Sequence, residues 1–143
     1  MAIHWTKFVE LVVSTTPAYT AGDALGAKSS FTSLPEHGVI MSVAVIDRDK
    51  ESANLDIVLF DTDIGGTTDN AAFSPSDAEL QTCLGAILVD TWKAFDTNSF
   101  GIVDNVGLPY WAPSGTIFFQ CVERGTPTFT ATDDIRIALG IVY

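Results

Sequence analysis

Positive charge and metal-binding side chains are scarce in this sequence of 143 residues. Seven Lys and Arg stand against 18 Asp and Glu, which gives a formal net charge of −11, and there are two His and two Cys. An acidic surface repels phosphate backbones and anionic lipid, so we expect neither nucleic-acid nor membrane binding. A zinc site needs three or four convergent His or Cys ligands, and these residues are scattered, so we expect no metal site.

Long hydrophobic runs and a secretory leader are also missing. No apolar run approaches the roughly 20 residues that span a bilayer. The first residues lack the basic segment and cleavage pattern of a signal peptide, so we expect synthesis in the cytoplasm. Two cysteines do not make a disulfide framework. We interpret Cys83 and Cys121 as small buried hydrophobic residues, with a single bridge between them as the alternative.

The proportion of charged residues is low, and the charge is unevenly distributed. Charged residues make up 17% of the chain and hydrophobic residues 47%, whereas typical soluble domains carry about 25% charge. This composition excludes intrinsic disorder and suggests that a partner covers some apolar surface. Residues 47–79 hold nine acids and two bases, a net −7 of the total −11. We expect the acidic stretch Asp47–Asp69 to face solvent.

Short β-branched and aromatic segments, separated by Pro and Gly, predict an all-β fold. The strongest strand patterns are Gly38–Asp47 and Ile135–Val142, in which apolar residues alternate. We expect about eight antiparallel strands in two packed sheets, a β-sandwich of the jelly-roll type. An immunoglobulin-like sandwich is the alternative, but its Cys…Trp…Cys pattern is absent.

One short helix is expected to interrupt the strands. In Ser74-Pro75-Ser76-Asp77, Ser74 is suited to be the N-cap, Pro75 the first helical residue and Asp77 the reciprocal cap, with the helix ending near Thr82. The length corresponds to one domain. We place the first strand at Phe8–Ser14, so residues 1–7 form an N-terminal arm and residues 8–143 form a single β-sandwich domain.

Catalytic motifs are not found, and we expect neither an enzyme nor a cofactor. The sequence has no G-x-S-x-G nucleophile elbow and no Gly-rich phosphate loop. In the loop Asp61–Asp69, Asp61, Asp63 and Gly66 match positions 1, 3 and 6 of a calcium-binding loop, but Ala72 stands at position 12 in place of Glu. A solvated acidic turn is the main interpretation, and an irregular calcium site is the alternative.

Aromatic residues gather in two places. Trp92, Phe95 and Phe100 bracket a polar loop, and Tyr110-Trp111 end a strand. The first interpretation is ordinary core packing. Trp and Tyr are also enriched at protein interfaces, so an interface anchor is the second interpretation. Stacking of Trp92 or Trp111 on sugar rings is the third.

Several segments resemble a group of small tailed-bacteriophage and prophage virion proteins. The likeness covers most of the chain from about Val12 onward and concerns turns and strands rather than catalytic motifs. The segments that carry it are Ser14–Asp23, Asp69–Phe73, Asn105–Leu108, Arg124–Phe129 and Asp134–Ile141. The resemblance implies a virion structural protein, most like a head decoration (cement) protein. Such proteins sit outside the major capsid shell, commonly as trimers, and bridge neighbouring capsomers.

From this resemblance we expect the major capsid protein as partner, a homotrimer, and a location on the capsid exterior. We expect the N-terminal arm, with His4, Trp5 and Phe8, to contact the shell or a neighbouring subunit. We expect Tyr110 and Trp111 to pack the oligomer. The alternatives are a tail, neck or fibre protein of the virion and a carbohydrate-binding β-sandwich module.

Overall fold

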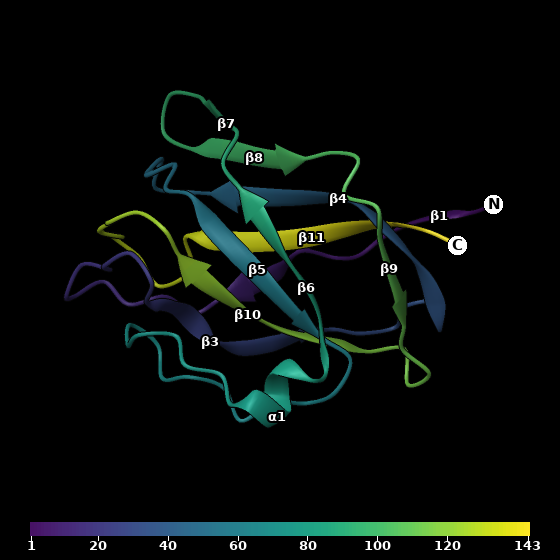
Figure 1. The fold of residues 1–143 in the computed structure, drawn as a ribbon. Coiled ribbons are helices and arrows are strands. Elements are labelled where there is room, and N and C mark those ends of the chain that lie inside the picture. Colours follow the sequence, from purple (N-terminus) through teal and green to yellow (C-terminus); the bar gives the residue numbers. More distant parts are fainter.

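The computed structural model describes residues 1–143 as two antiparallel sheets packed against each other (Figure 1). The elements are β1 (Ile3–Trp5), β2 (Val9–Leu11), β3 (Ala24–Phe31), β4 (His37–Asp47), β5 (Leu55–Phe60), α1 (Asp77–Leu80), β6 (Cys83–Val89), β7 (Trp92–Ala94), β8 (Ser99–Val103), β9 (Leu108–Trp111), β10 (Ile117–Glu123) and β11 (Ile135–Val142). The seven-stranded sheet has the order β1-β11-β4-β8-β7, with β2 also on β11 and β9 also on β4. The four-stranded sheet has the order β3-β10-β5-β6.

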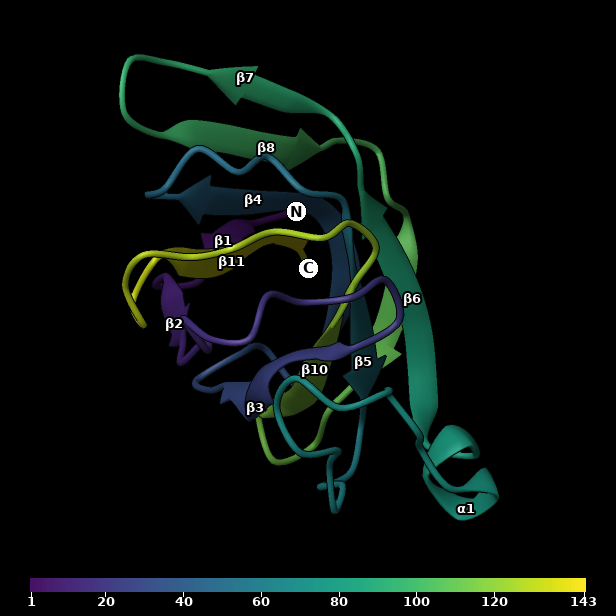
Figure 2. The same cartoon turned by 90° about the vertical axis from the view of Figure 1, so that its left-hand side faces the viewer.

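Strand pairing is nested along the chain. β2 pairs with β11, β3 with β10, β4 with β9 and β5 with β6, so the chain forms one long hairpin that is rolled up. Pairing of β11 with β4 and of β10 with β5 closes the roll into two layers (Figure 2). This is the jelly-roll arrangement. The predicted all-β sandwich with one short helix is confirmed, with eleven strands rather than about eight.

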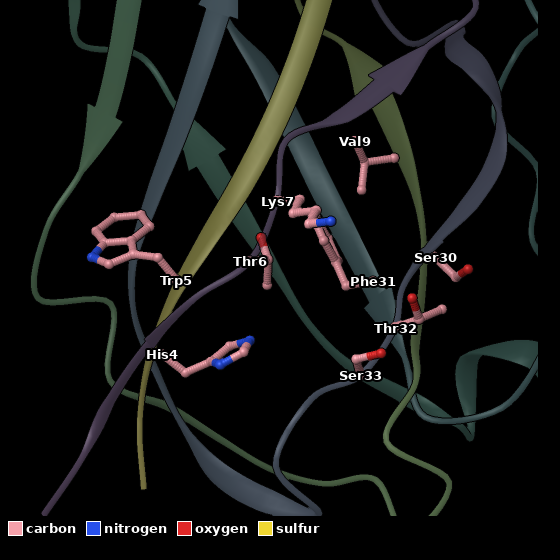
Figure 3. A pocket seen from close by; sticks show the side chains of 9 residues that line it. All are labelled: His4, Trp5, Thr6, Lys7, Val9, Ser30, Phe31, Thr32 and Ser33. Atoms are coloured by element: carbon pink, nitrogen blue, oxygen red, sulfur yellow. The ribbon is translucent and has the colours of Figure 1, made fainter.

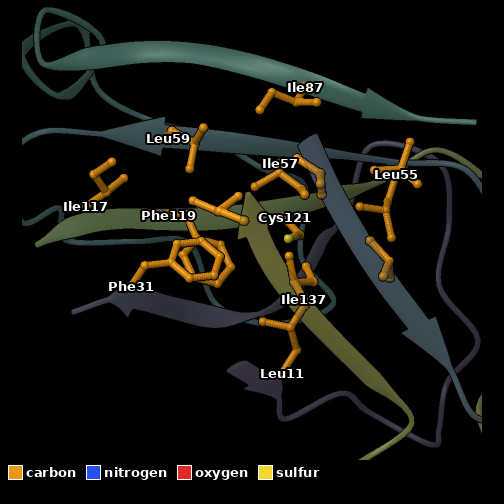
Figure 4. Close-up of a cluster of buried hydrophobic side chains, with 14 of the residues drawn as sticks. Leu11, Phe31, Leu55, Ile57, Leu59, Ile87, Ile117, Phe119, Cys121 and Ile137 are labelled. Atoms are coloured by element: carbon orange, nitrogen blue, oxygen red, sulfur yellow. The ribbon is translucent and has the colours of Figure 1, made fainter. Parts of the chain in front are cut away.

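The core lies between the inner faces of the two sheets. It contains 24 buried residues, among them alternate residues of β11 from Ile135 to Ile141. The rings of Phe31 and Phe119 stack with their centroids 4.4 Å apart, and the fully buried Cys121 lies nearby (Figure 4). Cys121 and the half-buried Cys83 are both free thiols, so no bridge joins them. A core of this size explains why the chain folds without disulfides.

The helix begins two residues later than predicted. Ser76, not Ser74, is the N-cap, and its hydroxyl accepts the backbone N–H of Glu79 at 3.1 Å. In return the Glu79 carboxylate accepts the backbone N–H of Ser76 at 2.7 Å and that of Gly65 at 2.7 Å. These hydrogen bonds, the one from Ser76 first, lower the pKa of Glu79. The reciprocal cap therefore uses Glu79 in place of Asp77.

The expected N-terminal arm contains a strand. Residues Ile3–Trp5 form β1 and pair with the last three residues of β11. Ala2 and Tyr143 exchange two backbone hydrogen bonds of 2.8 and 3.1 Å, so the two ends of the chain lie side by side. The backbone N–H of Thr6 donates a hydrogen bond to the carbonyl of Leu139, and the Thr6 hydroxyl accepts one from the N–H of Leu139. Further along the chain, β2 pairs with the other end of β11. The N-terminal segment is thus the edge of the seven-stranded sheet.

Candidate interaction surface

The outward-facing side of the seven-stranded sheet is mostly apolar. Directly paired residues of antiparallel strands point to the same face, and the register aligns Ile3 with Val142, Val142 with Val39, and Val39 with Pro109. Further rows join Ala138 to Ala44 and Ala44 to Ile102. We call this surface the outer apolar face; its apolar members are Ile3, Trp5, Val39, Ala44, Ile46, Phe100, Ile102, Pro109, Trp111, Ala138 and Val142, of which Ala44 and Ala138 are buried between their neighbours. The same register places the polar or charged residues Arg136, Ser42, His37 and Lys93 on this side of the sheet.

Most of this face was missed by sequence reasoning, although the sequence holds a signal for it. A strand with one face in water normally alternates apolar and polar residues. In Gly38–Asp47 the positions between the core residues are also largely apolar, as Val39, Ala44 and Ile46 show. Both sides of this strand are therefore apolar, which indicates a second covered face.

Trp5 lies at the edge of the outer apolar face. It pairs with Gly140, and its indole occupies the space where a side chain of Gly140 would be, since an added Cβ would lie 2.8 Å from Trp5 Cζ2. The residue is nevertheless 51% exposed. Phe8, in the turn between β1 and β2, is also exposed. Both residues that were predicted to contact a partner are thus accessible.

His4 points to the opposite side of β1 from Trp5. It lines a hollow of about 350 Å³ between this edge and β3, together with Lys7 and the hydroxyl residues Ser30, Thr32 and Ser33. Figure 3 shows the imidazole directed toward Ser33 and the indole of Trp5 turned away. The three predicted contact residues of the N-terminal segment therefore do not form one cluster.

The side chains of Tyr110 and Trp111 also lie on opposite faces of their strand. Tyr110 is 5% exposed, and its hydroxyl donates to the carbonyl of Pro35 at 3.0 Å. Burial raises the pKa of this phenol. Trp111 is 68% exposed and lies on the outer apolar face. Of the pair predicted to pack an oligomer, Trp111 is the surface residue and Tyr110 belongs to the core.

Of the aromatic residues near the β7–β8 hairpin, only Phe100 belongs to the outer apolar face. Trp92 pairs with Gly101, which pairs with Val45 of the core, so its ring faces inward and Trp111 faces outward. Phe95 is exposed at the tip of the hairpin. Trp92 and Trp111 therefore provide no common platform for a sugar ring.

The acidic loop Asp61–Asp69 is occupied by internal contacts. Asp63 forms an ion pair with Lys28 at 2.9 Å. Asp69 accepts hydrogen bonds from Tyr19 at 2.6 Å, from the backbone of Gly26 at 2.7 Å and from Ser14. No group of three or more His, Cys, Asp or Glu side chains in the molecule is arranged to hold a metal ion. The partial calcium motif acts here as a structural loop.

A second set of carboxylates is buried at one end of the sandwich. Glu123 is fully buried; one oxygen accepts the backbone N–H groups of Arg124 and Gly125, and the other has no partner. Burial, with Asp47 and Glu51 nearby, raises the pKa of Glu123 to about 7. Burial also raises the pKa of Asp47. Asp47 was expected to face solvent, and this expectation is wrong, because its carboxylate caps the turn after β4 through the N–H groups of two following residues.

Comparisons with protein-family models, with curated proteins and with solved structures find no match to this chain. The only helix has four residues, so no helix here is long and apolar enough to cross a membrane.

Proposed function

We propose that this protein is a structural component of a tailed-bacteriophage virion, a decoration (cement) protein that binds the outside of the major capsid shell and stabilises it. The segment resemblance set out above first suggested this role. The observation that supports it is a jelly roll, a fold common in capsid proteins, with exposed apolar side chains both at its N-terminal edge and on the outer apolar face. Exposed apolar patches of this kind are often functional.

A cement protein acts by mass action, because binding the assembled shell stabilises the assembled state. Such a protein needs no catalytic group, and we propose no enzymatic activity, cofactor or metal. It would be made in the cytoplasm of a bacterial host and reside on the capsid exterior. Repetition of the interface by capsid symmetry, and oligomerisation as a homotrimer, would add avidity to a modest single contact.

Within this proposal, the N-terminal edge contacts the shell or a neighbouring subunit through His4, Trp5 and Phe8. Trp5 and Phe8 are exposed, and His4 opens into a hollow beside Lys7. Trp111 packs against a neighbouring copy in the oligomer. The buried Tyr110 fixes β9, the strand that carries Trp111, through its hydrogen bond to the carbonyl of Pro35.

Quantitative mass spectrometry of purified virions, scaled to the major capsid protein, tests the role. We expect a copy number in the hundreds per particle. A handful of copies would move the protein to the tail, neck or fibre, and absence from the particle would overturn the virion role.

A matched pair of variants tests the contact edge. Phe8→Ala should lower the occupancy of particles, whereas Phe95→Ala should not, although Phe95 of the β7–β8 hairpin is at least as exposed, at 55% against 43%. Equal occupancy for both variants and the unchanged protein would remove Phe8 from the contact.

A further inference from the structure

The outer apolar face is large enough to form half of a stable interface. Ile3, Trp5 and Trp111 are 74, 51 and 68% exposed. At roughly 150–250 Å² for a large side chain, these three and their partly exposed neighbours offer roughly 600 Å² of apolar surface. The largest apolar patch of a typical monomer covers about 300–600 Å². A standard interface buries about 800 Å² on each partner, of which about 65% is apolar in homodimers, or about 500 Å².

Charge on this face does not select an oppositely charged partner. Although the chain carries −11 in total, the charged residues that the register places on this face balance. Arg136 stands 3.9 Å from Glu10, Lys93 pairs with Phe100, and Asp104 accepts a hydrogen bond from Ser42 between the rows of Ile102 and Pro109. Two copies could therefore bring these faces together without net repulsion, whereas a basic partner would find little net charge to bind.

The acidic segments lie away from this face. The turn after Asp47 lies at the end of the sandwich, and the loop Asp61–Asp69 packs on the other sheet through Ile64. Self-repulsion, which would otherwise oppose association of an acidic chain, is thereby reduced at this surface.

We propose that copies of this chain associate through the outer apolar face, with Ile102 and Trp111 inside the contact. This inference rests on the proposed function, which includes an oligomer, and it adds the surface through which the copies meet. It assigns the interface to the face of the seven-stranded sheet, since the register aligns the exposed Ile102 with Ala44 on β4 and Ala138 on β11. The occupant is a second copy, and both dimer and trimer satisfy the proposal.

Light scattering coupled to size-exclusion chromatography, over a range of protein concentrations and without capsid shells, tests the proposal. We expect the unchanged protein to be an oligomer. Ile102→Glu and Trp111→Glu should each raise the dissociation constant at least about tenfold, because they place a carboxylate in an apolar contact.

Leu88→Glu is the matched control. Leu88 is 46% exposed on β6, an edge strand of the other sheet, and Ile102 is 38% exposed on β8. The control should retain the oligomer. A monomeric unchanged protein at every concentration would overturn the proposal even if a variant failed to fold, and so would dissociation of Leu88→Glu to the same extent as Ile102→Glu.

Failure of this proposal and failure of the proposed function are distinguishable. A chain that is monomeric alone but abundant on particles overturns the association through this face and leaves the decoration role. An oligomer that is broken by Ile102→Glu, formed by a chain that is absent from virions, overturns the decoration role and leaves the association.

Discussion

The chain itself covers much of the outer face of the four-stranded sheet, whereas the outer apolar face of the seven-stranded sheet keeps large exposed side chains. On the covered face, Val58, Phe60 and Val122 pack against Ile64 of the segment between β5 and β6. On the other face, no loop or helix returns, because the β7–β8 hairpin extends the sheet at its edge instead of folding over it (Figure 1). The sandwich therefore has a covered side, the outer face of the four-stranded sheet, and an open side, the outer apolar face.

Gln120 anchors the segment that covers the outer face of the four-stranded sheet. Its amide donates to the carbonyl groups of Gly26 at 3.0 Å and Thr67 at 2.7 Å, and its oxygen accepts the N–H of Thr67 at 2.9 Å. A fully buried polar side chain is tolerated here because each of its groups has a partner. The open side has no comparable anchor, which is the expected state of a surface that exchanges water for another protein.

The same substitution on the two faces should have very different costs. Ile64→Ala removes a buried side chain and should lower the free energy of unfolding by about 3 kcal/mol, because a cavity forms beneath the loop. Ile102→Ala should cost less than about 1 kcal/mol in the monomer, since the side chain is already partly in water. Chemical denaturation at a concentration that favours the monomer measures both. Equal costs would mean that the two faces are covered alike.

Stability and association should also respond differently to pH. Glu123 has a pKa of about 7 in the folded protein, above the usual value near 4.3 in an unfolded chain. Folding therefore favours its protonated form, so the stabilisation is complete below the unfolded pKa and is lost as the pH rises toward 7. Glu123→Gln should be more stable than the unchanged protein at pH 8, by about 4 kcal/mol at most, and the difference should vanish near pH 4.

Association through the outer apolar face should not follow the protonation of Glu123, because Glu123 is buried on β10 of the other sheet. Urea denaturation and light scattering at matched pH values separate the two effects. A Glu123→Gln variant whose advantage is the same at pH 4 and pH 8 would contradict the origin assigned to the pH dependence.

The alternation of apolar residues was sufficient to predict the class of the fold and the whole of β11. It failed where pairing departs from strict alternation. In β4 the register with β11 passes from Ser42 to Ile40, so Met41 does not share the inner face with Val43 as alternation predicts. The three-residue strands β1 and β7 exist because an adjacent strand offers them hydrogen bonds, which no local pattern reveals.

Only part of the candidate interaction surface could be predicted from the sequence. Neighbouring residues of a strand point to opposite faces, so Tyr110 and Trp111 could not both lie on one surface once a strand was assigned there. His4 and Trp5 obey the same rule. Which member of each pair faces outward depends on the packing of the two layers, and this required the structure.

At the contact between Trp5 and Gly140, the N-terminal segment covers part of the open face. Gly140→Ala should displace the indole, because the new Cβ would lie 2.8 and 2.9 Å from Cζ2 and Cη2 of Trp5. The cost should be about 1 kcal/mol, since β1 lies at the sheet edge and can shift. The substitution should also increase the exposure of Trp5, which fluorescence quenching reports. In a Trp5→Ala background the same substitution should cost almost nothing. An undiminished cost there would show that the backbone of β11, rather than the indole, requires glycine at this position.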